Sequence, residues 1–259
     1  MGHLNLTTWE QAAAIGMDGV VHSGIYSPMW ELLPKGQWET VRTTFNDFGR
    51  DGVVDGFRLL TDGIDVQSEA FQQWARALRD AGLAVEPNLV MQKAAFWGDD
   101  EDLYRSFEPE RAPESWQGTY RVAFPRSTVA QVSPEWMDAS RQIYPLLEDM
   151  VTALHESGVL LTAGTDMMLP WMTPGTSLQR ELQLLGEAGL TPSEVLRVAT
   201  INGATAMGLD AELGTLSEGK IADIVVLNSD PLASVQHLRD IHLVVANGKP
   251  LSPSRLLGE

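Results

Sequence analysis

The sequence predicts an α/β fold with a parallel sheet, followed by a small β-rich tail. Short apolar runs that end on polar residues alternate with amphipathic helical stretches, and this order repeats about four times. After Gly214 two strand-like runs follow each other without a matching helix between them. The length of 259 residues suits one large domain, or one domain with a small accessory.

The first elements are predicted from capping and turn signals. Thr7 and Glu10 have the spacing of a capping box, so we expect a helix to begin there. Met1–Leu4 is too short to predict a strand. Gly19–Val21 is an apolar run that ends on His22, which predicts a short strand.

The middle of the chain mixes clear helical signals with weaker strand signals. Residues 25–50 are rich in aromatic residues, glycine and proline, and we expect a loop with one helix. Phe57–Leu60 is predicted as a strand. Ser68–Ala81 carries apolar residues at helical spacing before a glycine, which predicts a helix. The next strand is expected at Leu83–Val85, resuming after a proline as Leu89–Met91.

The following segment lacks clean periodicity, and an irregular insertion is predicted over about 93–134. A long loop in a compact domain is usually a lid or a binding insertion. Glu135–Ser157 then predicts a long helix, and Val159–Asp166 a short strand that ends on a carboxylate. An unpaired charge is costly to bury, so a carboxylate at this position indicates a site.

The C-terminal part begins with helices and ends with strands. Ser177–Ala188 predicts a helix, and Thr191–Glu194 combines a threonine N-cap, a proline and a glutamate that start another. Strands are expected at Ile221–Leu227 and His242–Ala246, with a hairpin-type turn at Asn247–Gly248. A (β/α)8 barrel needs eight strand–helix units, so about four units cannot close a barrel from one copy.

Composition excludes several function classes. The net charge is −17 and the pI about 4.6, so nucleic acid and anionic membranes are disfavoured as partners. No cysteine is present, which excludes disulfides, thiolate catalysis and cysteine-bound zinc. We find neither an apolar run of membrane-spanning length nor a signal peptide, and the compartment, cytoplasmic or periplasmic, stays open.

The candidate chemistry lies where predicted strands end. His22 and Asp166 occupy this position, and His3 does so less clearly. Two histidines and one aspartate suit a divalent ion such as zinc and leave a position for water. Such an ion would lower the pKa of that water toward about 7 and polarise a carbonyl. The alternative is a satisfied core histidine at His22 and a helix cap at Asp166.

Other polar residues have simpler explanations. His155 lies near the end of a predicted helix, where a cation is favoured. His237 and His242 fall in the β-rich tail and are expected to be structural or exposed. Asp62 and Glu86 also end strand-like runs, and we interpret each as a cap or a solvated residue.

Several stretches of the chain together resemble one known family. They are Leu161–Asp166, Glu181–Leu185, Ala188–Leu196, Ala199–Ala204, Gly214–Leu227 and Asn228–Leu232. They resemble the C-terminal half of an amidohydrolase-superfamily enzyme, in the group of imidazolonepropionase-like and Xaa-Pro dipeptidase-like metal-dependent hydrolases. Asp18–Ser23 resembles the family's sixth barrel strand with its metal-binding histidine, His22. Gly2-His3 resembles the end of the fifth strand with the other histidine.

The resemblance implies a fold and its boundaries. Residues 1–210 would form the C-terminal half of a TIM-like (β/α)8 barrel, and 211–259 the C-terminal part of a small β-sandwich. The family's first-strand His-x-His pair and the metal-bridging lysine of its fourth strand are absent here. The N-terminal half of the barrel is expected to be missing, or to be supplied by another chain.

The resemblance also implies a function, hydrolysis of a C–N bond in a small amide or dipeptide. His3 and His22 would hold the more exposed divalent metal, zinc by ligand type, and Asp166 would bind metal and carry the proton to the leaving nitrogen. Because half of the ligands are absent, we expect the isolated chain to be weakly active or inactive. The alternatives are a non-catalytic homologue, a subunit or homo-oligomer that completes its barrel by association, and a truncated reading frame.

Overall fold

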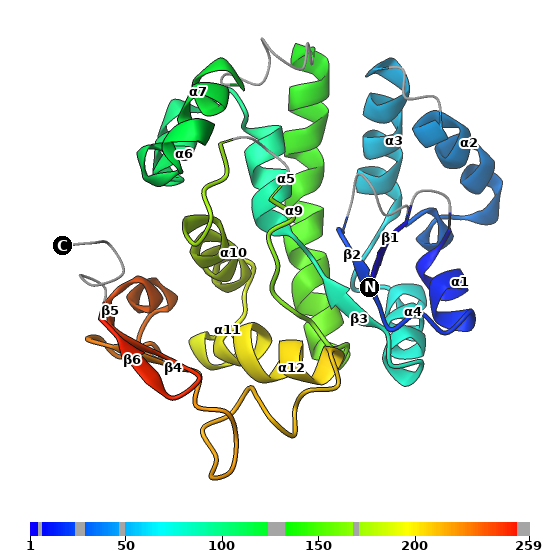
Figure 1. The fold of residues 1–259 in the computed structure, drawn as a ribbon. Coiled ribbons are helices and arrows are strands. Elements are labelled where there is room, and N and C mark those ends of the chain that lie inside the picture. Colours follow the sequence, from blue (N-terminus) through cyan, green and yellow to red (C-terminus); the bar gives the residue numbers. More distant parts are fainter. Residues whose placement is uncertain (5–6, 24–28, 47–49, 124–132, 168–170, 253–259) are drawn as a thin grey trace.

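The computed structural model describes residues 1–4, 7–23, 29–46, 50–123, 133–167 and 171–252. Within these residues there are two sheets of three strands each, with helices beside and between them (Figure 1). One sheet is parallel and is built from the N-terminal part of the chain, and the other is antiparallel and lies near the C-terminus. The predicted α/β class is therefore confirmed.

The parallel sheet brings together segments that are far apart in sequence. Its strands are, in spatial order, β1 (Gly2–His3), β2 (Gly19–Val21) and β3 (Ala84–Glu86). Met1–Leu4, which seemed too short for a strand, contributes β1. Leu161 adds a parallel bridge to Val85, so the run that leads to Asp166 lies beside β3 in the position of a fourth strand. This is the one bridge that the run forms with the described residues, so the strand predicted over Val159–Asp166 is much shorter than expected.

Helices make up most of the described chain. They are α1 (Trp9–Ala14), α2 (Lys35–Asn46), α3 (Arg50–Gly63), α4 (Glu69–Asp80), α5 (Leu89–Phe96), α6 (Glu101–Ser106), α7 (Glu114–Ala123), α9 (Pro134–Glu156), α10 (Thr176–Glu187), α11 (Pro192–Arg197) and α12 (Gly203–Ala206). Shorter 3-10 turns are η1 (Trp30–Leu32), η2 (Pro109–Arg111) and η4 (Val235–Arg239), and η3 (Val198–Asn202) is a π-helical turn.

Side-chain caps explain where the clearly predicted helices begin. The Ser68 hydroxyl accepts the backbone N–H of Phe71 at the start of α4. Thr191 and Glu194 form the predicted capping box of α11. At α1 the capping box lies one residue later than predicted, because Thr8 caps the helix and Gln11 closes the box.

Two strand predictions are wrong because short apolar runs do not separate strands from buried helices. Phe57–Leu60 lies within α3, where Val54, Phe57 and Leu60 are buried at a spacing of three, which is a helical period. Leu89–Met91 begins α5, a helix in which almost every residue is buried. A buried parallel strand would show the same continuous apolar run, so the sequence pattern did not distinguish the two.

The segment 93–134, predicted to be irregular, is largely helical. It holds the end of α5, then α6, η2 and α7, while 124–132 lie outside the described residues. Asp100 caps α6 by accepting the N–H of Leu103, and Pro109 opens η2. These helices are short and interrupted, which removed the periodic signal from the sequence.

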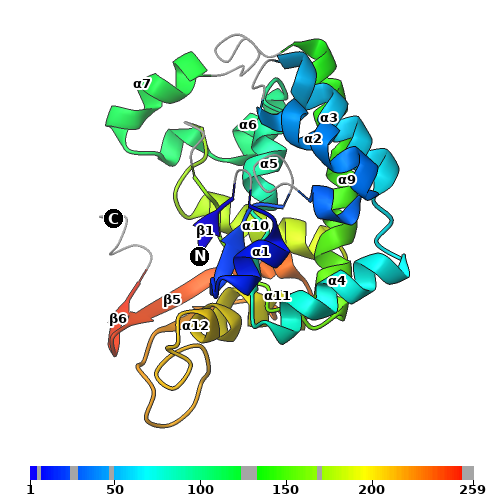
Figure 2. The same ribbon diagram turned by 90° about the vertical axis from the view of Figure 1, so that its right-hand side faces the viewer.

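The long helix α9 is the centre of the helical packing. It runs along α3 on one side and α5 on another, and also contacts α4 and α10 (Figures 1 and 2). Aromatic rings meet along these contacts, with Phe96 of α5 packed edge-on against Trp136 and Tyr144 of α9. The buried surface of α9 therefore packs against α3 and α4, which follow β2 in the chain, and against α5 and α10, which follow β3.

The antiparallel sheet holds β4 (Ile224–Leu227), β5 (Ile241–Ala246) and β6 (Lys249–Leu251). Asn247 and Gly248 form the predicted hairpin turn, with φ values of 49° and 75° that suit these residue types. None of the helices in the described parts of the chain combines the length and the apolar character that a bilayer crossing needs.

Candidate functional site

The carboxyl ends of the parallel strands gather the polar residues that the sequence singled out. β1 ends on His3, β2 is followed by His22, β3 ends on Glu86, and Asp166 lies five residues beyond Leu161. Parallel strands end at the same edge of a sheet, and this edge carries the sites of α/β folds. The topology thus places the three predicted site residues, and Glu86 with them, at one edge.

His22 and Asp166 come together across this edge. Nε2 of His22 lies 3.4 Å from Oδ2 of Asp166, an ion pair when the imidazole is protonated. The imidazole is buried and the carboxylate is about one quarter exposed. Both residues have positive φ, 66° and 38°, which non-glycine residues adopt rarely and which costs backbone strain. Strain of this kind persists where the surrounding structure fixes the backbone for a site.

The chemistry of this pair fits a divalent ion. Oδ2 of Asp166 is buried and accepts no hydrogen bond among the described residues. An imidazole nitrogen and a carboxylate oxygen that face each other are ligand types for zinc and similar ions. The side chain of His3 is not described, and no group of three His, Cys, Asp or Glu side chains converges among those that are. Of the three residues predicted as ligands, the described side chains of His22 and Asp166 are the two that lie together.

The backbone of His22 is held by the segment that follows β3. Its N–H donates to the carbonyl of Glu86 at 2.9 Å and to Oδ1 of Asn88 at 3.2 Å. Asn88 is fully buried, and its role was not predicted. The available signal was an asparagine directly after a strand end and a proline, where a left-handed residue often turns the chain.

Glu181 is a second residue that sequence reasoning missed. It lies on α10, is fully buried, and accepts the N–H groups of Leu89 and Val90 at 3.1 and 2.6 Å. Burial raises the pKa of its carboxyl to about 8, although these two hydrogen bonds act in the opposite direction. It caps the helix that begins beside His22.

The remaining predicted polar residues lie elsewhere. His155 pairs with Glu194 at 3.1 Å, and Nδ1 of His237 lies 2.7 Å from the carbonyl oxygen of Asp230. His242 is exposed on β5, and Asp62 is exposed on α3 rather than at a strand end. These arrangements are structural or solvent-facing, as expected for the three histidines.

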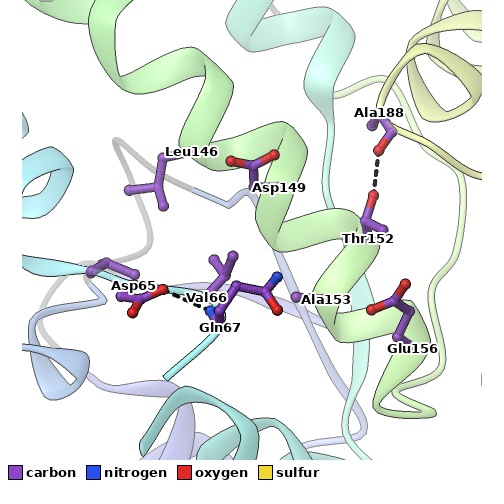
Figure 3. A pocket seen from close by; sticks show the side chains of 10 residues that line it. Asp65, Val66, Gln67, Leu146, Asp149, Thr152, Ala153, Glu156 and Ala188 are labelled. Carbon is purple, nitrogen blue, oxygen red and sulfur yellow. Dashed lines mark hydrogen bonds between the residues drawn. The ribbon is translucent and has the colours of Figure 1, made fainter. Parts of the chain in front are cut away.

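Two pockets lie away from His22 and Asp166. One, of about 480 Å³, lies beside α9, and Asp65, Asp149 and Glu156 give it an acidic lining (Figure 3). The other, of about 430 Å³, is lined by Lys93 of α5, by Trp97 directly after that helix, and by Arg180 and other residues. Neither includes a predicted site residue, so neither is the candidate site.

Known proteins similar to this chain point to one family. Residues 127–251 match the model of the Amidohydrolase family. An imidazolonepropionase from Symbiobacterium thermophilum is 28% identical over 178 residues, which cover 68% of this chain and 36% of that protein. An imidazolonepropionase from Pseudomonas aeruginosa is 25% identical over 182 residues, covering 68% of this chain and 43% of that protein.

Solved structures share the fold at lower identity. A bottromycin amidohydrolase superposes with a TM-score of 0.60 at 22% identity, covering 96% of this chain and 48% of that chain. A Xaa-Pro dipeptidase with bound methionine in its active site gives 0.54 at 15% identity, covering 94% of this chain and 42% of that chain. The chain thus spans less than half the length of these relatives. The family match over residues 127–251 and the imidazolonepropionase relatives support the resemblance of this chain to the amidohydrolase superfamily.

Proposed function

We propose that this chain carries part of the metal site of an amidohydrolase that hydrolyses a C–N bond in a small amide, such as a dipeptide or a cyclic amide. The observation that carries the proposal is the pair of His22 and Asp166 at the carboxyl edge of the parallel sheet. The family match over residues 127–251 and the imidazolonepropionase relatives support a hydrolase. The nature of the substrate is part of the proposal.

Each residue has a proposed role. His3 and His22 would hold a divalent ion, zinc by ligand type, with Asp166 as a further ligand. When bound, the ion supplies a Lewis acid that polarises a substrate carbonyl and acidifies water. Asp166 accepts a proton on its carboxylate and delivers it to the leaving nitrogen. Its partly exposed side chain allows this exchange, whereas the buried imidazole of His22 can only hold and orient.

The proposal includes a fold and its boundaries. Residues 1–210 would form the C-terminal half of a TIM-like barrel, and 211–259 part of a small β-sandwich. The parallel positions of β1, β2, β3 and Leu161 support the first part, and the antiparallel sheet supports the second. The sequence has no His-x-His pair, so we expect weak or no activity from this chain alone.

The test combines binding with catalysis. The purified chain is titrated with zinc chloride by calorimetry and then assayed on a panel of dipeptides and cyclic amides, with and without a chelator. Zinc binding with weak, chelator-sensitive hydrolysis supports the proposal. Absence of both contradicts it, and chelator-sensitive turnover comparable to ordinary enzymes overturns the expectation of weak activity.

A second candidate function is that of a subunit whose barrel another chain completes. Its support is apolar surface around the antiparallel sheet, where the exposed fractions of Leu216, Val225 and Leu232 are 82, 56 and 59%. Exposed strand edges also favour association. Sedimentation velocity tests this candidate, because a clean monomer with a cooperative melt argues against a missing partner.

A further inference from the structure

Asn88 occupies a capping position but does not act as a cap. It precedes α5 directly, has a φ of 53°, and makes no side-chain hydrogen bond to the first turn of that helix. Asparagine is among the preferred N-cap residues, so the missing cap needs a reason. The reason is that Glu181 already binds the first N–H groups of α5, which leaves the Asn88 amide available for other partners.

The Asn88 amide links the ends of β2 and β3. Its Oδ1 accepts the backbone N–H of His22 at 3.2 Å, and its Nδ2 donates to Oε1 of Glu86 at 2.9 Å. The amide therefore uses both of its ends, one on the residue after β2 and one on the last residue of β3. Because Asn88 is fully buried, its hydrogen bond to the His22 N–H is shielded from water, whereas the one to Glu86 is partly buried.

The Glu86 carboxylate continues the link toward Asp166. It lies against the backbone of Gly164, so closely that a Cβ added at Gly164 would lie 2.0 Å from Oε1 and 2.1 Å from Cδ of Glu86. A side chain at position 164 would therefore require the Glu86 carboxylate to move from this place. Gly164 precedes Asp166 by two residues, so Glu86 limits where the segment that carries Asp166 can lie.

We propose that Glu86 and Asn88 are positioning residues that set the placement of His22 relative to Asp166. The proposal rests on the proposed function, because it assigns a purpose to the separation of these two side chains. The contacts run from His22 through Asn88 and Glu86 to Gly164, across the strand ends on both sides of β3. Glu86 is therefore more than the cap or solvated residue that its sequence position suggested.

The backbone around Asn88 is fixed from both directions, as a positioning element requires. Glu181 holds the start of α5, and Gln92 on the same helix donates its Nε2 to the carbonyl of Pro87 at 3.1 Å. The left-handed turn at Asn88 is thus held by neighbours on both sides. Outer residues that orient metal ligands typically change metal affinity by about 10- to 100-fold when they are replaced.

The experiment distinguishes a positioning role of Glu86 from an effect of its charge. The full chain is labelled with ¹⁵N-histidine, which gives five backbone signals because the sequence holds five histidines. The variants are Asn88→Ala, Glu86→Ala and Glu86→Gln, and Glu218→Ala removes an exposed carboxylate as the matched control. For each we measure the shift and hydrogen exchange of the His22 amide, the zinc affinity by calorimetry, and the melting temperature.

Positioning predicts one pattern of results. Asn88→Ala and Glu86→Ala shift the His22 amide signal, speed its exchange, and weaken zinc binding by about tenfold. Glu86→Gln restores both readouts, because its amide oxygen still accepts from Asn88 Nδ2. Glu218→Ala matches the wild type in all three measurements.

Other results overturn the proposal. If Glu86→Gln behaves like Glu86→Ala, the effect comes from the charge of Glu86, and the proposed positioning role is wrong. If the His22 amide signal does not shift in Asn88→Ala, Asn88 does not position His22. If that signal shifts while the zinc affinity stays the same, the Asn88 contact stabilises the fold but does not affect metal binding. If the wild-type chain binds no zinc, the proposed function fails, and the His22 signal still decides whether the pair positions that residue.

A double-variant cycle tests the contact with Gly164 independently. Gly164→Ala should lower the melting temperature, and Glu86→Ala in the same chain should remove most of that loss, because the obstructing carboxylate is gone. Gly203→Ala, a glycine with open space around it, is the control. Additive effects of the two substitutions would contradict the contact.

Discussion

Glu181 on α10 accepts the backbone N–H of Val90, the second residue of α5, at 2.6 Å. The same carboxylate accepts from Leu89, so one buried acid satisfies two of the N–H groups that a helix start leaves open. Since α5 begins beside the end of β3, this contact fixes the first turn of the helix next to the candidate site.

The raised pKa of Glu181 predicts a pH-dependent stability. Its carboxyl titrates near 4.5 in the unfolded chain and at about 8 in the folded chain, so the folded state binds more protons between these values. Its contribution to stability is therefore complete below about pH 4.5 and is lost as the pH rises through 8. We expect Glu181→Gln to remove a fall in unfolding free energy on the order of 4 kcal/mol over this window.

Urea unfolding between pH 5 and pH 9 measures this difference. The rest of the acidic chain also titrates, so the wild type is compared with Glu181→Gln and with Glu187→Gln, a half-exposed glutamate on the same helix. Parallel pH curves for the wild type and Glu181→Gln would show that Glu181 is not the responsible group.

The His22–Asp166 pair predicts a selective loss of zinc binding. Asp166→Asn keeps the shape of the side chain but removes its charge, and His22→Ala removes an imidazole donor. Each should weaken zinc binding by at least about tenfold in calorimetric titrations. His242→Ala, which removes an exposed histidine on β5, should leave the affinity unchanged. An equal loss in all three variants would indicate nonspecific binding to the acidic surface.

The sequence predicts the strand-end residues well because their signal is local. His22 and Asp166 each follow a short apolar run. The parallel topology then brings the ends of these runs to the same edge of the sheet. Their separation could not be predicted, because it depends on Asn88 and Glu86 between them. Those contacts join residues that are far apart in sequence and follow no periodic pattern.

The capping role of Glu181 was not predicted, because the secondary structure of the segment that it caps was predicted wrongly. With Leu89–Met91 interpreted as a strand, there was no helix start for a carboxylate to cap. Once α5 is a helix, a buried acid opposite its first N–H groups has a physical reason. The spacing of Ser177, Glu181 and Leu184, all on the buried side of α10, was the available signal.

Phe57 offers a stability test of α3, the segment whose strand prediction was wrong. Its ring is fully buried and lies 6.0 Å from that of Phe96 and 6.4 Å from that of Trp136, measured between centroids. Phe57→Ala should lower the unfolding free energy by about 3–5 kcal/mol, because it leaves a cavity between α3, α5 and α9. Urea unfolding measures the loss, and Arg58→Ala, an exposed neighbour on α3, should change stability by less than about 0.5 kcal/mol.

Gly214 and Gly219 form a matched pair for separating backbone strain from steric contact. Their φ values are 86° and 88°, so alanine is equally strained at both positions. A Cβ at Gly219 meets nothing within 4 Å, whereas at Gly214 it would lie 2.7 Å from the Cα of Ile201. Gly219→Ala should therefore cost about 1–2 kcal/mol of stability, and Gly214→Ala measurably more, because the close contact with the backbone of η3 must also be relieved. Thermal unfolding of the two variants tests this directly, since equal losses would mean that the Gly214 turn does not pack against Ile201.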